Sequence, residues 1–133
     1  MESNCIFCKI INGKKALKIY EDKKTVCLLD INPISRGHCL IMPKKHFKNI
    51  FDINEEYLKE IICASKKVSK LLKQKLNATG VNILHASGKS AQQSIFHFHL
   101  HLVPRYKNDG LDTWPKSNYK EHSLEEVYQK IKK

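Results

Sequence analysis

Three histidines alternate with apolar residues in one short stretch late in the chain. His97, His99 and His101 stand two residues apart between Ile95 and Val103. Successive side chains of a β-strand point to opposite faces, so a strand over residues 95–103 places the imidazoles on one face. The other face then carries Phe96, Phe98, Leu100 and Leu102. Imidazole exchanges a proton near neutral pH, which suits nucleophilic or acid–base chemistry on a phosphate-sized group.

The same alternation has two other interpretations. Paired histidines on one face of a strand can bind zinc, and a half-exposed strand can simply present a polar outer face. A polar loop with Ser87, Gly88 and Ser90 precedes the histidines and favours a functional site.

A pair of cysteines near the start of the chain is the second candidate for chemistry. Cys5-Ile6-Phe7-Cys8 is half of a tetrahedral zinc site, although a redox pair and two core cysteines remain alternatives. Cys27, Cys39 and Cys63 lie among apolar residues and are expected to be reduced core side chains.

The elements that must position these residues alternate short strands with one long helix. Apolar spacing and turn residues predict helices over 5–12, 55–76 and 124–132 and strands over 19–21, 25–29, 38–42, 81–84 and 95–103. We therefore expect an α+β fold, a mostly antiparallel sheet of about five strands packed on the long helix. The 133 residues suit one domain, with a core over 1–106 and a tail over 107–133 that ends in the short helix.

Charge and cysteine content narrow the class of protein. The formal charge is +11, but 22 of the 24 basic residues are lysines scattered along the chain, so a solvated surface is favoured over specific nucleic-acid binding. No apolar run is long enough to span a membrane. An odd number of cysteines, five, and a first segment without an apolar signal core point to the cytoplasm.

One known family shares these motifs. The run His97-Phe98-His99-Leu100-His101-Leu102-Val103 resembles the signature of the histidine triad family. Four other segments agree in order and spacing: Leu29-Asp30-Ile31-Asn32-Pro33, Gly37-His38, Ile41-Met42-Pro43-Lys44-Lys45-His46 and Gln93-Ser94. The resemblance extends over residues 5–105 and is greatest to the nucleotide-binding branch, particularly its zinc-carrying members.

This resemblance implies hydrolysis or transfer at the α-phosphorus of a nucleoside 5′-phosphate derivative. His99 would attack phosphorus and form a covalent nucleotidyl-histidine, while His101 and His38 would hold the phosphate. Gln93 and Ser94 would contact phosphate oxygens or the leaving group. The leading expectation is a purine nucleoside phosphoramidase that releases AMP or GMP; cleavage of dinucleoside polyphosphates is a related alternative.

The resemblance also implies a nucleoside pocket. Asp30 would hold the ribose hydroxyls, although a carboxylate at this point can equally cap the Asn32-Pro33 turn. Apolar walls for the base would come from Phe7, Leu28 and Ile31, which can also be plain core residues.

Zinc and a second copy of the chain are the implied partners. His46 and His97 would join Cys5 and Cys8 in a structural zinc site, and the tail near Trp114 would reach the active site of the partner in a homodimer. The sequence departs from the family pattern at Ala86, where Asn is usual, and at Gln92, where Gly is usual. The alternative from another class is a zinc-stabilised nucleotide-binding or scaffold protein without turnover.

Overall fold

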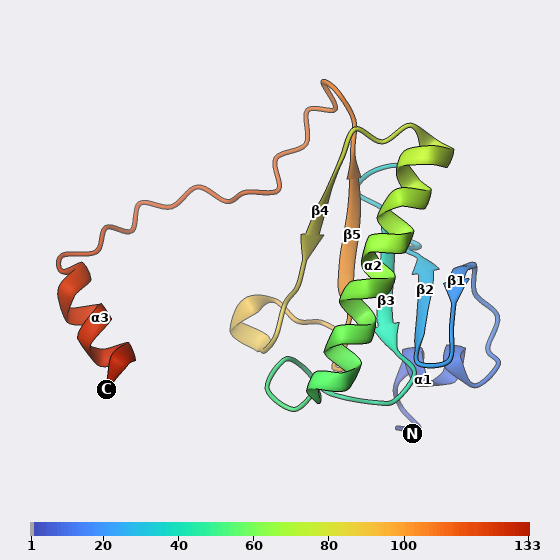
Figure 1. Cartoon of the computed structure of the whole chain (residues 1–133), viewed down its shortest axis with the longest axis horizontal. Helices are drawn as coiled ribbons and strands as arrows, with labels where there is room; N and C mark the ends of the chain where they lie inside the picture. Colours follow the sequence, from blue (N-terminus) through green and yellow to red (C-terminus); the bar gives the residue numbers. More distant parts are fainter. Residues whose placement is uncertain (1) are drawn as a thin grey trace.

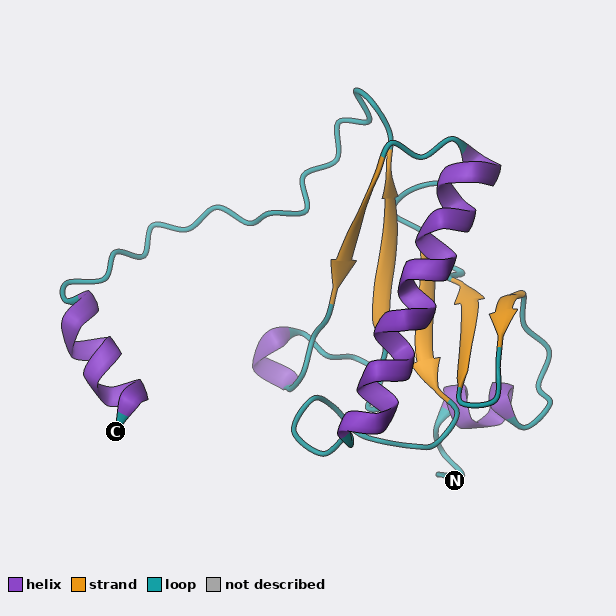
Figure 2. Cartoon of the chain, viewed as in Figure 1, coloured by secondary structure: helices purple, strands orange, loops and turns teal. Residues whose placement is uncertain are grey.

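The chain folds around one antiparallel sheet. The computed structural model describes residues 2–133, and its five strands lie in the order β1-β2-β3-β5-β4 (Figure 1, Figure 2). The helices and strands are α1 (Ile6–Ile11), β1 (Lys18–Glu21), β2 (Thr25–Leu29), β3 (Cys39–Pro43), α2 (Glu55–Leu76), β4 (Gly80–Leu84), the 3-10 helix η1 (Lys89–Ala91), β5 (Leu100–Arg105) and α3 (Leu124–Lys132). This architecture confirms the predicted α+β class and five-stranded sheet.

The long helix α2 covers one face of the sheet. It has the bounds that the sequence predicts because both ends carry clear signals: the Asn54 side chain accepts a hydrogen bond from the Tyr57 amide, and Asn77 adopts the left-handed conformation that ends the helix. Its buried residues, among them Ile61 and Val68, pack on Phe98 and the strands in the main core. The exposed side carries lysines, as expected: Lys66, Lys67, Lys70 and Lys73.

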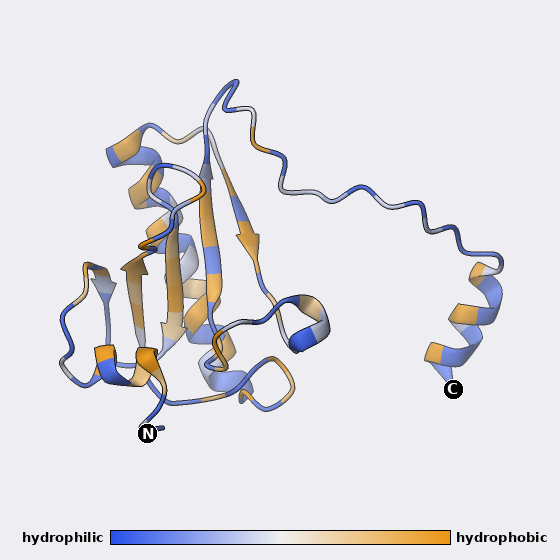
Figure 3. Cartoon of the chain, turned by 180° about the vertical axis from the view of Figure 1, so that it is seen from behind, coloured by the Kyte–Doolittle hydropathy of each residue, from blue (hydrophilic) through white to orange (hydrophobic). Residues whose placement is uncertain are grey.

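The opposite face of the sheet carries α1 and the histidines. Phe7 and Ile10 of α1 pack with Leu28, Leu40 and Met42 in a second apolar cluster. Seen from behind, α1 lies in front of the strands, whereas α2 lies in front of them in the first view (Figure 1, Figure 3). Each face of the sheet is thus covered by one helix, and the face under α1 is the one that positions the candidate chemistry.

The histidine stretch differs from the predicted strand. The strand β5 begins only at Leu100 and runs to Arg105, so the expected strand over 95–103 is wrong at both ends. Residues 95–99 run outside the ladder, where the Phe98 amide donates a hydrogen bond of 2.7 Å to the Phe47 carbonyl instead of to a neighbouring strand. Phe98 is buried as expected, but Phe96 is 40% exposed, because the chain bends before it joins the sheet.

Two apolar positions of α2 also differ from expectation. Cys63 is exposed and is therefore not a core cysteine, and Ile62 is half-exposed. Ile62 lies at the edge of the helical stripe, whereas Cys63 lies outside it, since the residues one turn away from Cys63 on either side are exposed. Helical spacing gives the centre of a buried stripe more reliably than its width.

The tail leaves the sheet at Arg105. The Arg105 guanidinium donates to both carboxylate oxygens of Asp109 at 2.8 Å and to Asn82 at 2.9 Å, which fixes the first turn of the tail to β4. Beyond it, the chain runs past the β4 edge to α3, whose residues are all exposed (Figure 1). One side of α3 is apolar and faces solvent (Figure 3). No helix within residues 2–133 has the length and apolar character needed to cross a membrane.

Candidate active site and metal centre

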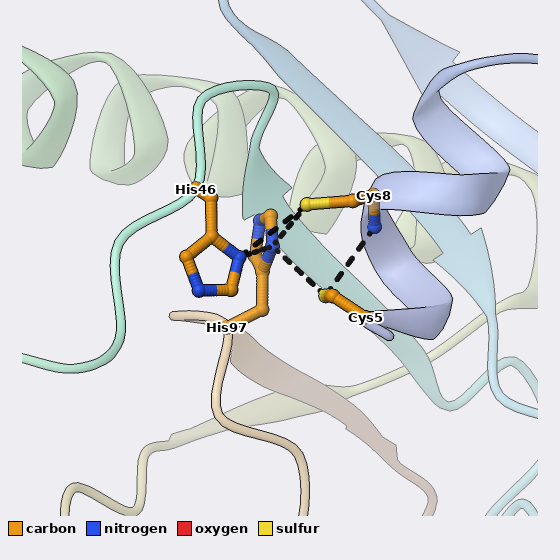
Figure 4. Close-up of side chains that lie close together, drawn as sticks. All are labelled: Cys5, Cys8, His46 and His97. Atoms are coloured by element: carbon orange, nitrogen blue, oxygen red, sulfur yellow. Dashed lines mark hydrogen bonds between the residues drawn. The ribbon is translucent and has the colours of Figure 1, made fainter. Parts of the chain in front are cut away.

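Two cysteines and two histidines converge at the N-terminal end of α1. Cys5 caps this helix and accepts a hydrogen bond from the Cys8 amide, so both thiols face the same point one turn apart. His46 follows β3, and His97 comes from the bend before β5. All four side chains point toward one another (Figure 4), and their ligand atoms lie within 4.8 Å of one another.

The donor atoms lie close enough together to surround one tetrahedral metal ion. Ligand atoms around zinc lie about 3.3–3.8 Å apart. Here Cys5 Sγ lies 3.4 Å from His97 Nδ1, Cys8 Sγ lies 3.3 Å from His46 Nδ1, and the two Nδ1 atoms are 3.1 Å apart. His97 Nε2 donates to the Pro43 carbonyl at 2.8 Å, so Nδ1 carries the free lone pair. These residues fit zinc as a four-ligand structural site.

His99 occupies a second, separate position although it stands only two residues from His97. Its Nδ1 donates to the His97 carbonyl at 2.8 Å, and a carbonyl can only accept, so Nδ1 carries the proton of the neutral ring. The lone pair is therefore on Nε2. The edge-on ring of Phe7, with its centroid 5.2 Å from that of His99, packs against this imidazole and helps to fix its orientation.

His38 and His101 form a hydrogen-bonded pair beside His99. The Ile34 amide donates to His38 Nδ1 at 3.1 Å, which puts the His38 proton on Nε2. His38 Nε2 then donates to His101 Nδ1 at 3.0 Å, and the proton of a neutral His101 is left on its Nε2. The centroids of His101 and His99 are 5.1 Å apart. The pair thus offers an N–H donor on the ring that neighbours His99.

Burial keeps these rings neutral. It lowers the pKa of His101 from 6.5 to about 4, and nearby His99 and His38 would disfavour a further positive charge. Burial also lowers the pKa values of His99 and His38; the Asp30 carboxylate, 3.5 Å from His38 Nε2, partly opposes the shift at His38. Neutral imidazole is the form that can attack phosphorus.

The residues expected to line a nucleoside pocket are spread over different environments. Phe7 and Leu28 are buried in the second apolar cluster, whereas Ile31 is 92% exposed. Asp30 accepts from the Asn32 amide at 2.8 Å, which is the turn-capping bond, and also lies beside His38. The fold brings Asp30 to the histidines but does not join the three apolar residues into one wall.

Gln93 and Ser94 occupy unlike positions. The amide of Gln93 is buried: its Oε1 accepts from the Gly88 amide at 2.8 Å, and its Nε2 donates to the carbonyls of Lys48 and Ile95 at 2.7 and 3.1 Å. This side chain therefore holds the loop before the histidines. Ser94 is exposed and lines a cavity of about 640 Å³ beside Cys5 and His46.

Comparison with known proteins identifies the family. The HIT domain model matches residues 12–108. The chain belongs to the HIT (histidine triad) family. It is 37% identical to "Protein hit" of Bacillus subtilis, over 98% of this chain and 93% of that one. It is 38% identical to an adenosine 5′-monophosphoramidase of Candida albicans, over 98% of this chain and 90% of the relative.

Solved HIT structures share the fold and, in one case, a metal. The chain superposes on SMU.412c of Streptococcus mutans with a TM-score of 0.90 at 30% identity, covering 99% of this chain and 85% of the other. A zinc-bound histidine triad protein of Mycobacterium smegmatis gives 0.79 at 35% identity, covering 95% and 88%. HIT members of known activity include hydrolases, and hydrolysis is the general chemistry of this site.

The two departures from the HIT pattern lie in the loop before the histidines. Gln92 adopts the left-handed conformation, with φ 69° and ψ 27°, which glycine adopts without steric cost. The glycine usual at this position is thus explained by the backbone. Ala86 is half-buried and lacks the amide that Asn would supply.

His85 also contacts the histidine stretch, although no sequence motif marks it as a site residue. Its Nδ1 donates to the His99 carbonyl at 2.9 Å, and its ring lies over Phe98 with centroids 4.4 Å apart. The available signal was weak: a lone polar residue directly after the strand 81–84, at the entrance to the Ser87-Gly88 loop.

Proposed function

We propose that the protein is a nucleotide hydrolase that splits the phosphorus–nitrogen bond of purine nucleoside 5′-phosphoramidates and releases AMP or GMP. The observation that carries the proposal is the proton arrangement at His99. Its Nδ1–H is held by the His97 carbonyl, so the lone pair of a neutral ring is on Nε2, beside the His38–His101 pair. An imidazole held in this tautomer is ready to act as a nucleophile.

The reaction then has two displacements at the α-phosphorus. In the first, His99 Nε2 forms a bond to phosphorus and the phosphorus–nitrogen bond breaks, and the amine leaves with a proton relayed from solvent through the Ser94 hydroxyl. In the second, water attacks phosphorus and gives its proton back to solvent, the bond to Nε2 breaks, and the nucleoside monophosphate is released. The Nε2–H of His101, placed by His38, donates to the phosphate and stabilises the charge that develops on its oxygens.

The remaining site residues have supporting roles in this proposal. Asp30 accepts hydrogen bonds from the ribose hydroxyls, and Ser94 contacts the leaving group. Phe7 and Leu28 are the buried residues beneath the proposed base pocket, and Ile31 lies at its exposed edge. Gln93 acts through the loop that it holds.

Zinc, bound by Cys5, Cys8, His46 and His97, would be structural. Four protein ligands leave no open position for substrate, and the site would tie α1 to the start of the triad stretch. The adenosine phosphoramidase relative and the zinc-bound neighbour support this branch of the family.

A homodimer is the proposed assembly. Within residues 2–133 the β4 edge of the sheet has no strand partner, α3 presents an apolar stripe to solvent, and Trp114 is 81% exposed on the tail that passes this edge. Single helices of nine residues are marginal in water, so a covering surface is expected. Light scattering should give the mass of two chains; a monomer at micromolar concentration would contradict the proposal. The five unpaired cysteines suit a reducing compartment, the cytoplasm.

The test of the function is hydrolysis of adenosine 5′-phosphoramidate by wild type and His99→Ala. We expect turnover and an adenylyl adduct on His99 in the wild type, and neither in the variant. The rates of hydrolysis of AMP derivatives, GMP derivatives and dinucleoside polyphosphates then show which base and which leaving group the enzyme prefers. Nucleotide binding without turnover in the wild type would favour the non-catalytic alternative. An affinity that falls steeply with added salt would favour nucleic acid as the ligand.

A further inference from the structure

His85 links the candidate nucleophile to two surface loops. Its Nδ1 donates to the His99 carbonyl at 2.9 Å, so in the neutral ring Nε2 is left as an acceptor. The Ser87 hydroxyl lies within hydrogen-bond distance of Nε2 and donates to it. Ser87 Oγ in turn accepts from the Ile50 amide at 2.8 Å. A continuous chain of hydrogen bonds therefore runs from Ile50 through Ser87 and His85 to the backbone of His99.

The backbone that this chain reaches lies outside the sheet. Residues 95–99 lie outside the β5 ladder, which begins at Leu100. The orientation of the His99 ring depends on this segment, because Nδ1 donates to the His97 carbonyl two residues earlier. The ring of His85 also lies over Phe98, the residue between the two carbonyls, with an angle of 30° between the planes. His85 thus contacts this peptide segment twice, at the His99 carbonyl and at the Phe98 ring.

We propose that His85 is a positioning residue for His99. It fixes the carbonyl of the nucleophile's own peptide unit, and with it the direction of His99 Nε2; this role rests on the proposed function. The placement of His85 argues against direct contact with substrate. His85 is exposed, and it lines an apolar cavity of about 350 Å³ together with Leu58 and Ile62 of α2, the helix that covers the face of the sheet away from His38 and His101.

Asn and Gln substitutions at position 85 distinguish the hydrogen bond made by Nδ1 from the one made by Nε2. The amide nitrogen of Asn takes the place of Nδ1 and keeps the donor to His99, whereas that of Gln reaches the place of Nε2 and loses it. Variants His85→Asn, His85→Gln and His85→Ala are compared with His122→Ala, the same change at an exposed histidine of the tail. Thermal unfolding and bound zinc are measured for each variant, so that a folding defect is seen separately.

The expected result is a loss in kcat rather than in KM. For a misplaced nucleophile we expect His85→Ala and His85→Gln to lower kcat roughly 10- to 100-fold, with His85→Asn within about threefold of wild type. His122→Ala should match wild type. Ser87→Ala should give a smaller loss and faster hydrogen exchange at the Ile50 amide, and it should add little to His85→Ala because both act in one chain.

Three outcomes would overturn the inference while the proposed function stands. They are a folded His85→Ala with wild-type kcat, a loss confined to KM, and a His85→Asn as impaired as His85→Gln. If His85→Ala does not fold, the comparison of kcat between His85→Asn and His85→Gln tests the inference. If His99→Ala retains wild-type turnover, the proposed function itself is refuted, and the role of His85 is refuted with it.

Discussion

Replacing Gln93 by alanine should destabilise the fold more than it impairs substrate binding. The residue is 5% exposed, and its amide makes three hydrogen bonds, all to backbone groups of two loops. A net hydrogen bond contributes about 1 kcal/mol, and a buried group left without a partner costs about 1–3 kcal/mol. Because the three partners lie near the surface and water can reach some of them, we expect a loss of about 2–4 kcal/mol in the free energy of unfolding.

The neighbouring glutamine is the matched control. Gln92 is exposed, and its replacement by alanine removes the same atoms with an expected change within about 0.5 kcal/mol. Urea unfolding followed by circular dichroism measures both variants, with the m-value checked for a change in the surface exposed on unfolding. A second variant, Gln93→Glu, places a carboxylate against the carbonyls of Lys48 and Ile95. Burial raises the pKa of such a group, so this variant should become more stable as the pH falls from about 7 to 5.

The competing role for Gln93 is direct contact with the phosphate. In that case Gln93→Ala would unfold like Gln92→Ala, within about 0.5 kcal/mol of wild type, yet lose most of the proposed phosphoramidase activity. That pairing of results would refute the structural reasoning, because three intact backbone hydrogen bonds cannot be removed from a buried site at no cost.

Three further predictions concern the same region. Gln92→Gly should raise the free energy of unfolding by up to about 1 kcal/mol, because glycine adopts the left-handed conformation without strain. The greater freedom of glycine in the unfolded chain offsets part of this gain. Urea unfolding measures the change, and a destabilised variant would contradict this prediction. Cys8→Ala should bind less than about half an equivalent of zinc and lower the melting temperature, and zinc at the wild-type level would exclude this ligand set. The pKa of His101 lies at about 4 in the fold and 6.5 outside it, so the unfolded chain binds more protons between these values. Stability should therefore fall as the pH drops through this window, with His101→Gln showing a shallower decline; equal slopes would contradict the assignment.

Much of the fold could be predicted because its signals are local. The bounds of α2 follow from the Asn54 cap and the apolar spacing, and α3 begins after Ser123, whose side chain accepts from the Glu126 amide as the sequence suggests. The cysteine–histidine cluster was predicted by family resemblance rather than by spacing, since Cys8 and His46 are 38 residues apart and meet only in the folded chain.

The triad stretch could not be predicted in the same way. Alternation of apolar and polar residues requires only an extended chain, whereas a strand also requires a partner for each backbone group. Around His97 the side chain points to the cysteines and its Nε2 donates to the Pro43 carbonyl, so the backbone bends away from the ladder. Long-range bonds of this kind leave no trace in the local pattern, which is also why the link from His85 to His99 was missed.

The separate roles of the histidines follow from their backbone partners rather than from the motif. His97 and His99 belong to the same repeat, yet a carbonyl holds Nε2 of the first and Nδ1 of the second, so their lone pairs are on opposite nitrogens. The first is left with the nitrogen that faces the cysteines and the second with one that is free to attack. His101, whose Nδ1 accepts from His38, is left with a donor. In the proposed function these three identical side chains would act as ligand, nucleophile and proton donor, because each is hydrogen-bonded at a different atom.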